Sequence, residues 1–144
     1  KAVVIQGVPS LAWGQGRDCT FIGALEAAMA VTEHPYSYAA LMGLSGLAFR
    51  VRWCNEATQT KWCGSCPIGE MPDEYRALEA HTGWSFPTML QFGIQNPDRA
   101  AIRERLVHAI DAGRPVLAYA ATLDMTVVYG YEDGGNTLFV RDYS

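Results

Sequence analysis

Cys19 is the residue of this chain whose type and position are best suited to chemistry. It lies at the expected start of a helix, in a segment that reads WGQGRDCTFI from Trp13 to Ile22. Amide groups of a first helical turn and the helix dipole favour an anion, so a thiol there ionises more readily than an isolated side chain. Gln15 and the neighbouring glycines bring amide donors close to the same sulfur, as an oxyanion hole requires. We therefore expect a thiol nucleophile; the alternative is a buried cysteine that only fills the core.

The three remaining cysteines, Cys54, Cys63 and Cys66, give weaker signals. The spacing of Cys63 and Cys66 matches a thioredoxin-type redox centre, but Pro67 argues against the helix that such a centre needs. A zinc site with His81 as fourth ligand has two ligands at suitable spacing, whereas the other spacings match no recognised zinc finger. A structural disulfide or reduced thiols are the simpler alternatives. We predict no cofactor and no metal.

Composition limits the classes of protein to which the chain can belong. With 144 residues, of which 49% are hydrophobic, it is long enough for one well-filled core, and we predict a single domain over residues 1–144. A net charge of -4 and the lack of a basic stripe argue against a nucleic-acid partner. The longest apolar stretch, residues 39–49, is interrupted by glycines and is shorter than the roughly 20 residues that span a bilayer. We expect a cytoplasmic protein without a membrane partner, and the oligomeric state stays open.

Hydrophobic periodicity and punctuating residues predict helices in the first part of the chain and mainly strands in the last. The helices are expected over residues 19–32, 38–44, 72–81 and 98–112, the first two capped by Asp18 and Ser37. The strands are expected over residues 2–5, 49–53, 116–121, 125–131 and 137–142. A turn at Asp133-Gly134-Gly135-Asn136 should join the last two strands. This order predicts an α+β fold with segregated elements.

Several short motifs resemble those of papain-like cysteine peptidases. The stretches GRPVLAY (residues 113–119), VVYGYED (127–133) and VRD (140–142) resemble the closing sheet of the bacteriocin-leader peptidase-like branch. The stretches DCTF (18–21), YSY (36–38) and GLAFR (46–50) are similar to the N-terminal domain of butirosin biosynthesis protein H, whose relatives include cysteine acyltransferases. The resemblance implies a papain-like fold, in which an N-terminal helical part, with the cysteine at the head of the central helix, packs on a C-terminal antiparallel sheet.

The resemblance also implies roles for individual residues. Cys19 takes the place of the nucleophile, and Asp142 takes that of the polar residue that orients a histidine. The histidine itself is expected six residues before Gly130, where this chain has Asp124. The family's oxyanion glutamine lies six residues before the nucleophile, but here Trp13 stands at that place and Gln15 lies four residues before Cys19. Backbone amides of Gly16 and Cys19 are alternative oxyanion donors. His81 is a second candidate for the catalytic base.

Asp124 cannot simply replace a histidine as the base. A free thiol has a pKa near 8.5 and a free aspartate one near 3.9, so moving the proton between them costs about 6 kcal/mol. A carboxylate at this place is better suited to orienting a substrate amine or a water, or to holding a proton itself.

Two functions follow from these residues. The first is thiol-dependent acyl transfer, or hydrolysis of an amide or thioester, with Cys19 as nucleophile and with Asp124, Asp142 or His81 assisting. Its partners would be a peptide, an acyl carrier or a small-molecule substrate. The alternative is a catalytically inactive papain-like domain that binds a peptide or small ligand in its cleft.

Overall fold

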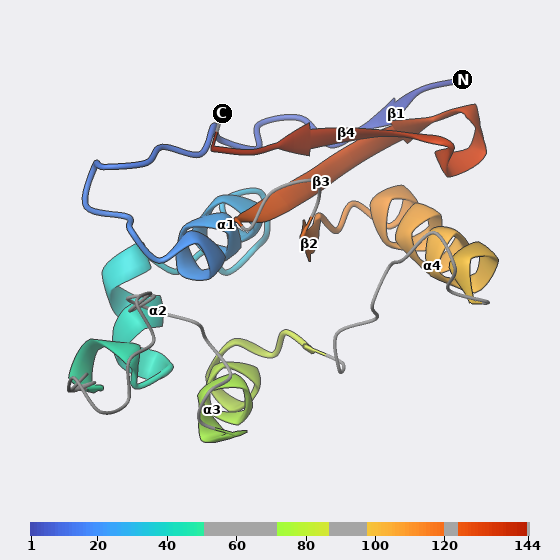
Figure 1. The fold of residues 1–144 in the computed structure, drawn as a ribbon. Coiled ribbons are helices and arrows are strands. Elements are labelled where there is room, and N and C mark those ends of the chain that lie inside the picture. The colour runs from blue at the N-terminus through green and yellow to red at the C-terminus, as the bar shows by residue number, and fades with distance from the viewer. Residues whose placement is uncertain (51–71, 87–97, 120–123, 144) are drawn as a thin grey trace, which may run out of the picture.

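The protein has an α+β architecture, as the order of its elements predicts (Figure 1). The computed structural model describes residues 1–50, 72–86, 98–119 and 124–143. Within these ranges, the helices are α1 (Thr20–Met29), α2 (Tyr38–Leu44), α3 (Pro72–Thr82) and α4 (Arg99–Asp111). The strands are β1 (Val3–Val4), β2 (Val116–Tyr119), β3 (Met125–Glu132) and β4 (Thr137–Arg141). Two short 3-10 helices, η1 (Leu47–Phe49) and η3 (Asp133–Gly135), complete the described part.

Strand β3 is the centre of an antiparallel sheet. It pairs with β4 along one edge, from Val127 opposite Arg141 to Glu132 opposite Thr137. The other edge of β3 is shared by β2 at its beginning and by β1 near its end. Because every strand in the sheet pairs with β3, the position of this strand fixes that of the other three.

The predicted turn between the last two strands is present as η3. Asp133, Gly134 and Gly135 have φ values of 50°, 62° and 88°. These are left-handed conformations, which glycine adopts without a steric penalty and which aspartate tolerates better than most residues. The sequence signal is therefore local and strong, and the hairpin forms where it was expected.

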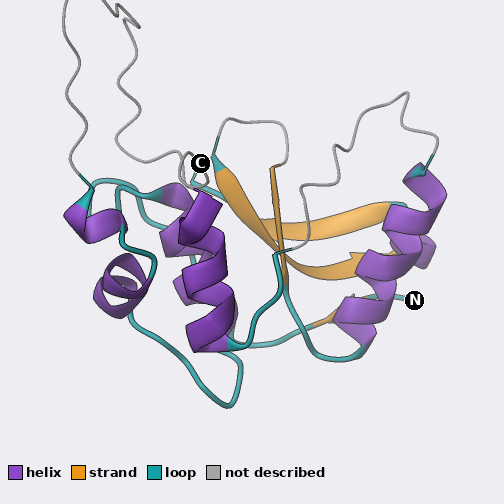
Figure 2. Ribbon diagram, turned by 90° about the horizontal axis from the view of Figure 1, so that it is seen from below, coloured by secondary structure: helices purple, strands orange, loops and turns teal. Residues whose placement is uncertain are grey.

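Helix α1 is the central helix of the molecule. Eight of its residues are buried, from Phe21 to Met29, so almost its whole surface is covered. It packs against β3 and β2 of the sheet and against α2. The views in Figures 1 and 2 place α1 and α4 on the same side of the strands. Met125 and Val127 of β3 belong to the same buried cluster as α1, so the core joins the N-terminal helix to the C-terminal sheet.

Two predicted boundaries are wrong. Asp18 is not the N-cap of the central helix, because Cys19 holds that place with an extended backbone (φ -82°, ψ 102°). The helix ends at Met29 rather than near Thr32, whose amide and hydroxyl both donate to the Met29 carbonyl and close a tight turn. The cap Ser37 is confirmed, since its hydroxyl oxygen accepts from the Ala40 amide at 3.2 Å.

The alternation that predicted a strand from residue 49 does not hold at its first position. Phe49 lies in η1, which follows Gly46 in a left-handed conformation (φ 82°) and so turns the chain away from an extended course. The Phe49 amide donates to the Gly46 carbonyl at 3.0 Å. The rest of the expected strand, residues 51–53, lies outside the described residues. None of the described helices is long and apolar enough to cross a membrane.

Gly130 lets β1 and β4 approach the central strand closely, and replacing it tests this packing. A Cβ at this position would lie 2.7 Å from the Val3 carbonyl oxygen and 3.0 Å from the Phe139 ring. Because one of these atoms is backbone, we expect Gly130→Ala to lower the free energy of unfolding by about 2 kcal/mol. Gly43→Ala is the control: a Cβ there meets nothing within 4 Å, so it should stabilise α2 by about 0.5–1 kcal/mol. Urea denaturation of both variants measures the difference, and an equal effect would contradict this account of Gly130.

Candidate active site at the head of the central helix

Cys19 lies at the N-terminus of α1, as the sequence predicts. As the N-cap it precedes the first helical turn, and its carbonyl oxygen accepts from the Gly23 amide at 2.9 Å. Its own amide donates to the hydroxyl oxygen of Tyr38 at 2.9 Å. The residue is only 2% exposed. The thiol therefore sits at the positive end of the helix dipole, beneath the surface.

Thr20 joins the head of α1 to the beginning of β3 and to the chain that follows β4. Its hydroxyl oxygen accepts from the Met125 amide at 3.4 Å, and its carbonyl oxygen accepts from the Tyr143 hydroxyl at 3.1 Å. Each of these three residues directly follows a predicted site residue: Cys19, Asp124 and Asp142 respectively. The fold thus brings the backbone that follows Asp124 to the head of α1, and it brings the side-chain hydroxyl of the residue after Asp142 to the same helix end.

Tyr38 contacts Cys19, which the sequence did not predict. Its hydroxyl covers the Cys19 amide, which is one of the two backbone donors expected for an oxyanion hole. The Tyr38 backbone is held in turn, because its amide donates to Glu26 Oε1 at 2.9 Å. Nothing in the local sequence shows this contact, since nineteen residues separate Cys19 from Tyr38.

Tyr75 of α3 is a second residue that the sequence did not indicate. Its ring packs on Phe21 at 5.6 Å between centroids, nearly at right angles, and on Phe86 at 5.9 Å. Burial raises the pKa of Tyr75, and the neighbouring Tyr119, Glu74 and Cys19 raise it further. The raised pKa keeps the Tyr75 hydroxyl protonated, and Tyr75 lies close enough to Cys19 for the charge of the one to affect the other.

Gln15 and His81, the other two predicted site residues, are exposed, whereas Cys19 is buried. Gln15 is exposed and lines a hollow of about 350 Å³ between the loop of residues 9–17 and one face of α1; Cys19 is not among the residues that line it. His81 is exposed at the end of α3, where its Nδ1 lies 2.7 Å from the Ala77 carbonyl oxygen. Its own carbonyl oxygen accepts from the Tyr36 hydroxyl at 3.0 Å.

The other three cysteines, Cys54, Cys63 and Cys66, are not among the residues that the structure describes. Among the residues that are described, no group of three or more histidine, cysteine, aspartate or glutamate side chains could hold a metal ion.

Glu26 forms an ion pair with Arg17 and accepts the hydrogen bond from the Tyr38 amide, and its ionisation should make the stability of the fold depend on pH. Burial pushes the pKa of Glu26 up, but hydrogen bonds from Arg17 and the Tyr38 amide, with the charge of Arg17, outweigh it and leave the pKa below its ordinary value. A lowered carboxylate pKa stabilises the fold above the unfolded-state value, near 4.3 for glutamate, and this stability is lost as the pH falls through the folded-state value.

We therefore expect Glu26→Gln to reduce the loss of stability on acidification. Between about pH 5 and about pH 3, the free energy of unfolding should fall less in Glu26→Gln than in the unmodified protein. Urea denaturation at several pH values measures this slope. Glu33→Gln, at an exposed position in the loop after α1, is the control. Identical slopes in the unmodified protein and Glu26→Gln would show that the ion pair contributes nothing.

Comparison of the chain with protein-family models, curated proteins and solved structures finds no match.

Proposed function

We propose that the protein is a papain-like thiol enzyme that transfers an acyl group, or hydrolyses an amide or thioester, with Cys19 as its nucleophile. The observation that carries the proposal is the pair of hydrogen bonds at Thr20. They hold the head of α1 against the start of β3 and against the segment after β4. A papain-like enzyme needs this convergence, because its nucleophile comes from the helix and its polar partners come from the sheet.

In the proposed reaction, Cys19 Sγ bonds to the carbonyl carbon of an amide or thioester. The leaving group departs with a proton, and an acyl-Cys19 thioester remains. An acceptor amine or a water then attacks this intermediate and restores the thiol. In this proposal Asp124, which directly precedes β3, and Asp142, which directly follows β4, supply a carboxylate that orients the incoming nucleophile or accepts its proton.

Two tyrosine hydroxyls favour a stabilised oxyanion. The carbonyl oxygen of a substrate bonded to Sγ lies near the Cys19 amide, the position that the Tyr38 hydroxyl now holds at 2.9 Å. A phenolic hydroxyl can accept one hydrogen bond and donate another, and in this proposal Tyr38 donates to the oxyanion. We propose Tyr75 of α3 as the second donor, since burial and its neighbours, Cys19 among them, raise its pKa and favour the protonated hydroxyl. In this proposal the two tyrosines do the work that the family assigns to a glutamine side chain.

One observation favours the alternative, a papain-like domain that binds a ligand without catalysis. Cys19 is 2% exposed and its amide is already bonded, whereas the hollow beside α1 that Gln15 and Tyr143 line is open to solvent. A peptide or small ligand seated in that hollow would leave the thiol untouched. The two functions differ in whether a substrate reaches Sγ.

Restoring the family's histidine tests the proposal. If Asp124 stands in the place of the catalytic base, Asp124→His should raise the rate of thioester hydrolysis at neutral pH by about tenfold or more, since a positioned base contributes about 10²–10⁴-fold. Hydrolysis of a chromogenic thioester by purified protein measures the rate.

The matched control is Asp98→His, which adds a histidine at the N-cap of α4, on an exposed residue. It should leave the rate unchanged. A rate for Asp124→His that equals or falls below that of the unmodified protein, with the fold intact by circular dichroism, would argue against the papain-like placement of Asp124 and for the binding alternative.

A further inference from the structure

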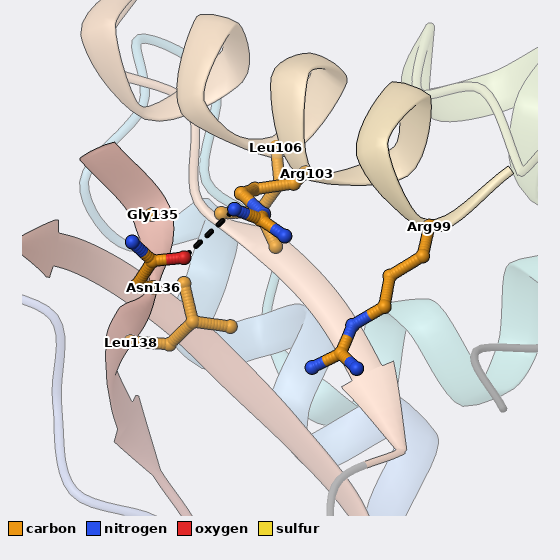
Figure 3. Close-up of a pocket in the computed structure, with 6 residues that line it drawn as sticks. All are labelled: Arg99, Arg103, Leu106, Gly135, Asn136 and Leu138. Carbon is orange, nitrogen blue, oxygen red and sulfur yellow. Dashed lines mark hydrogen bonds between the residues drawn. The ribbon is translucent and has the colours of Figure 1, made fainter. Parts of the chain in front are cut away.

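A second hollow, remote in sequence from Cys19, lies between α4 and the hairpin of β3 and β4. It encloses about 100 Å³ and is lined by two arginines of α4 together with residues of η3, the hairpin and the helix (Figure 3). The six lining residues are Arg99, Arg103, Leu106, Gly135, Asn136 and Leu138. Arg99 and Arg103 are one helical turn apart, so their side chains leave α4 on the same face and reach towards the hairpin.

Arg103 is held in a fixed position. One of its terminal nitrogens, Nη1, donates to Asn136 Oδ1 at 2.7 Å, and Asn136 Nδ2 donates to Asp133 Oδ2 at 3.2 Å. The stem of the side chain packs against Gly135, where a Cβ would lie 3.0 Å from Arg103 Cγ. Because a guanidinium carries five N–H donors, the contact with Asn136 leaves others for a ligand. A donor that is already ordered costs less entropy when it binds.

The lining combines positive charge with apolar surface. Two guanidinium groups on one hollow match a planar or tetrahedral oxyanion, since the arginine fork binds carboxylate and phosphate with paired hydrogen bonds. Leu106 and Leu138 line the same space, and Leu138 is 38% exposed although it lies in a strand. A bare inorganic anion would leave this apolar surface in water, whereas an anion attached to a hydrocarbon group would cover it.

We propose that this hollow binds a carboxylate carried on a short apolar group, with Arg99 and Arg103 holding the carboxylate and Leu106 and Leu138 contacting the hydrocarbon. The proposal is independent of Cys19 and of the reaction proposed for it. A free carboxylic acid and the C-terminal carboxylate of a peptide that ends in an apolar residue share this chemistry.

Titration with small carboxylates tests the site on the whole chain. Sodium acetate, sodium butyrate and sodium phosphate are added at constant ionic strength, and the ¹H–¹⁵N shifts of Gly135 and Asn136 are followed. We expect saturable shifts with a dissociation constant for butyrate that is at least about threefold below that for acetate, because the extra methylenes cover leucine surface. Phosphate should bind more weakly than butyrate. An N-acetylated dipeptide ending in leucine, against its C-terminal amide, tells whether a peptide terminus also fits.

Variants separate the two halves of the site. Arg99→Gln should weaken butyrate and acetate alike by about tenfold or more, because a hydrogen bond to a charged group is lost. Leu138→Thr should remove the preference for butyrate and leave acetate binding unchanged. Arg105→Gln, an exposed arginine of the same helix that does not line the hollow, is the control.

Three results would overturn the proposal: shifts that do not saturate, equal effects of Arg99→Gln and Arg105→Gln, or tighter binding of phosphate than of butyrate. None of these results bears on thioester turnover at Cys19, so this proposal and the proposed enzymatic function can fail separately.

Discussion

Replacing Cys19 by serine is expected to lower thioester turnover by about 10³-fold or more, because loss of a nucleophile removes the covalent step altogether. The serine hydroxyl is a much weaker nucleophile than a thiol when no histidine lies beside it. Hydrolysis of a chromogenic thioester, measured with purified protein at equal concentrations, gives the ratio of the two rates.

The fold should tolerate this substitution, which makes the loss interpretable. Cys19 is the N-cap of α1, and serine is among the residues preferred at that position because its oxygen accepts from an amide of the first turn. This gain offsets the cost of burying a hydroxyl in place of a thiol, which is about 1–3 kcal/mol when the hydroxyl finds no partner. Cys63→Ser changes another cysteine in the same way and should leave turnover unchanged. Equal turnover in the unmodified protein and Cys19→Ser would rule out Cys19 as nucleophile.

The largest expected effect on stability comes from the ion pair of Arg50 with Glu74. Arg50 Nη1 lies 2.7 Å from Glu74 Oε1, and the two side chains are 16% and 6% exposed. Removing the Glu74 carboxylate takes this partner from a guanidinium that is largely shielded from water, and water cannot make up for the lost interaction. For a largely buried pair the loss costs about 3 kcal/mol. We expect Glu74→Ala to lower the free energy of unfolding by about this amount, measured by urea denaturation.

The neighbouring residue supplies the control. Asp73 also lies in the first turn of α3, and its ion pair with Arg76 is 3.7 Å long between side chains that are 90% and 79% exposed. Asp73→Ala removes the same helix-dipole contribution but only an exposed pair, so its effect should stay below about 1 kcal/mol. If the two variants lose equal stability, burial of the Arg50–Glu74 pair does not matter.

The parts of the fold that local chemistry determines were predictable from sequence. Ser37 caps α2 through its own side chain, and the Asp133–Asn136 turn joins β3 and β4 through residues that accept left-handed conformations. The helical spacing of Ile22, Leu25 and Met29 predicted the central helix, in which all three are buried. The predicted strand failed at its first residue, Phe49, because Gly46 takes a left-handed conformation and starts a 3-10 helix there.

The contacts that build the site join residues far apart in the chain. The Tyr143 hydroxyl reaches the Thr20 carbonyl across 123 positions, and the Met125 amide reaches the Thr20 hydroxyl across 105. No local pattern encodes such pairs, because they depend on how the sheet packs on α1. Asp124 and Asp142 were inferred from the family resemblance. The residues that follow them, Met125 and Tyr143, contact Thr20 at the head of α1. The catalytic roles of both aspartates stay predictions.

The most direct test of the central claim is the mass of the protein after brief incubation with a small acyl thioester and rapid acid quench. If Cys19 is the nucleophile, the intact protein gains one acyl group, proteolytic mapping places the group on the peptide that contains Cys19, and Cys19→Ser shows no such gain. An acyl group found on Cys54, Cys63 or Cys66 while Cys19 stays unmodified, or an equal gain in Cys19→Ser, would contradict the account.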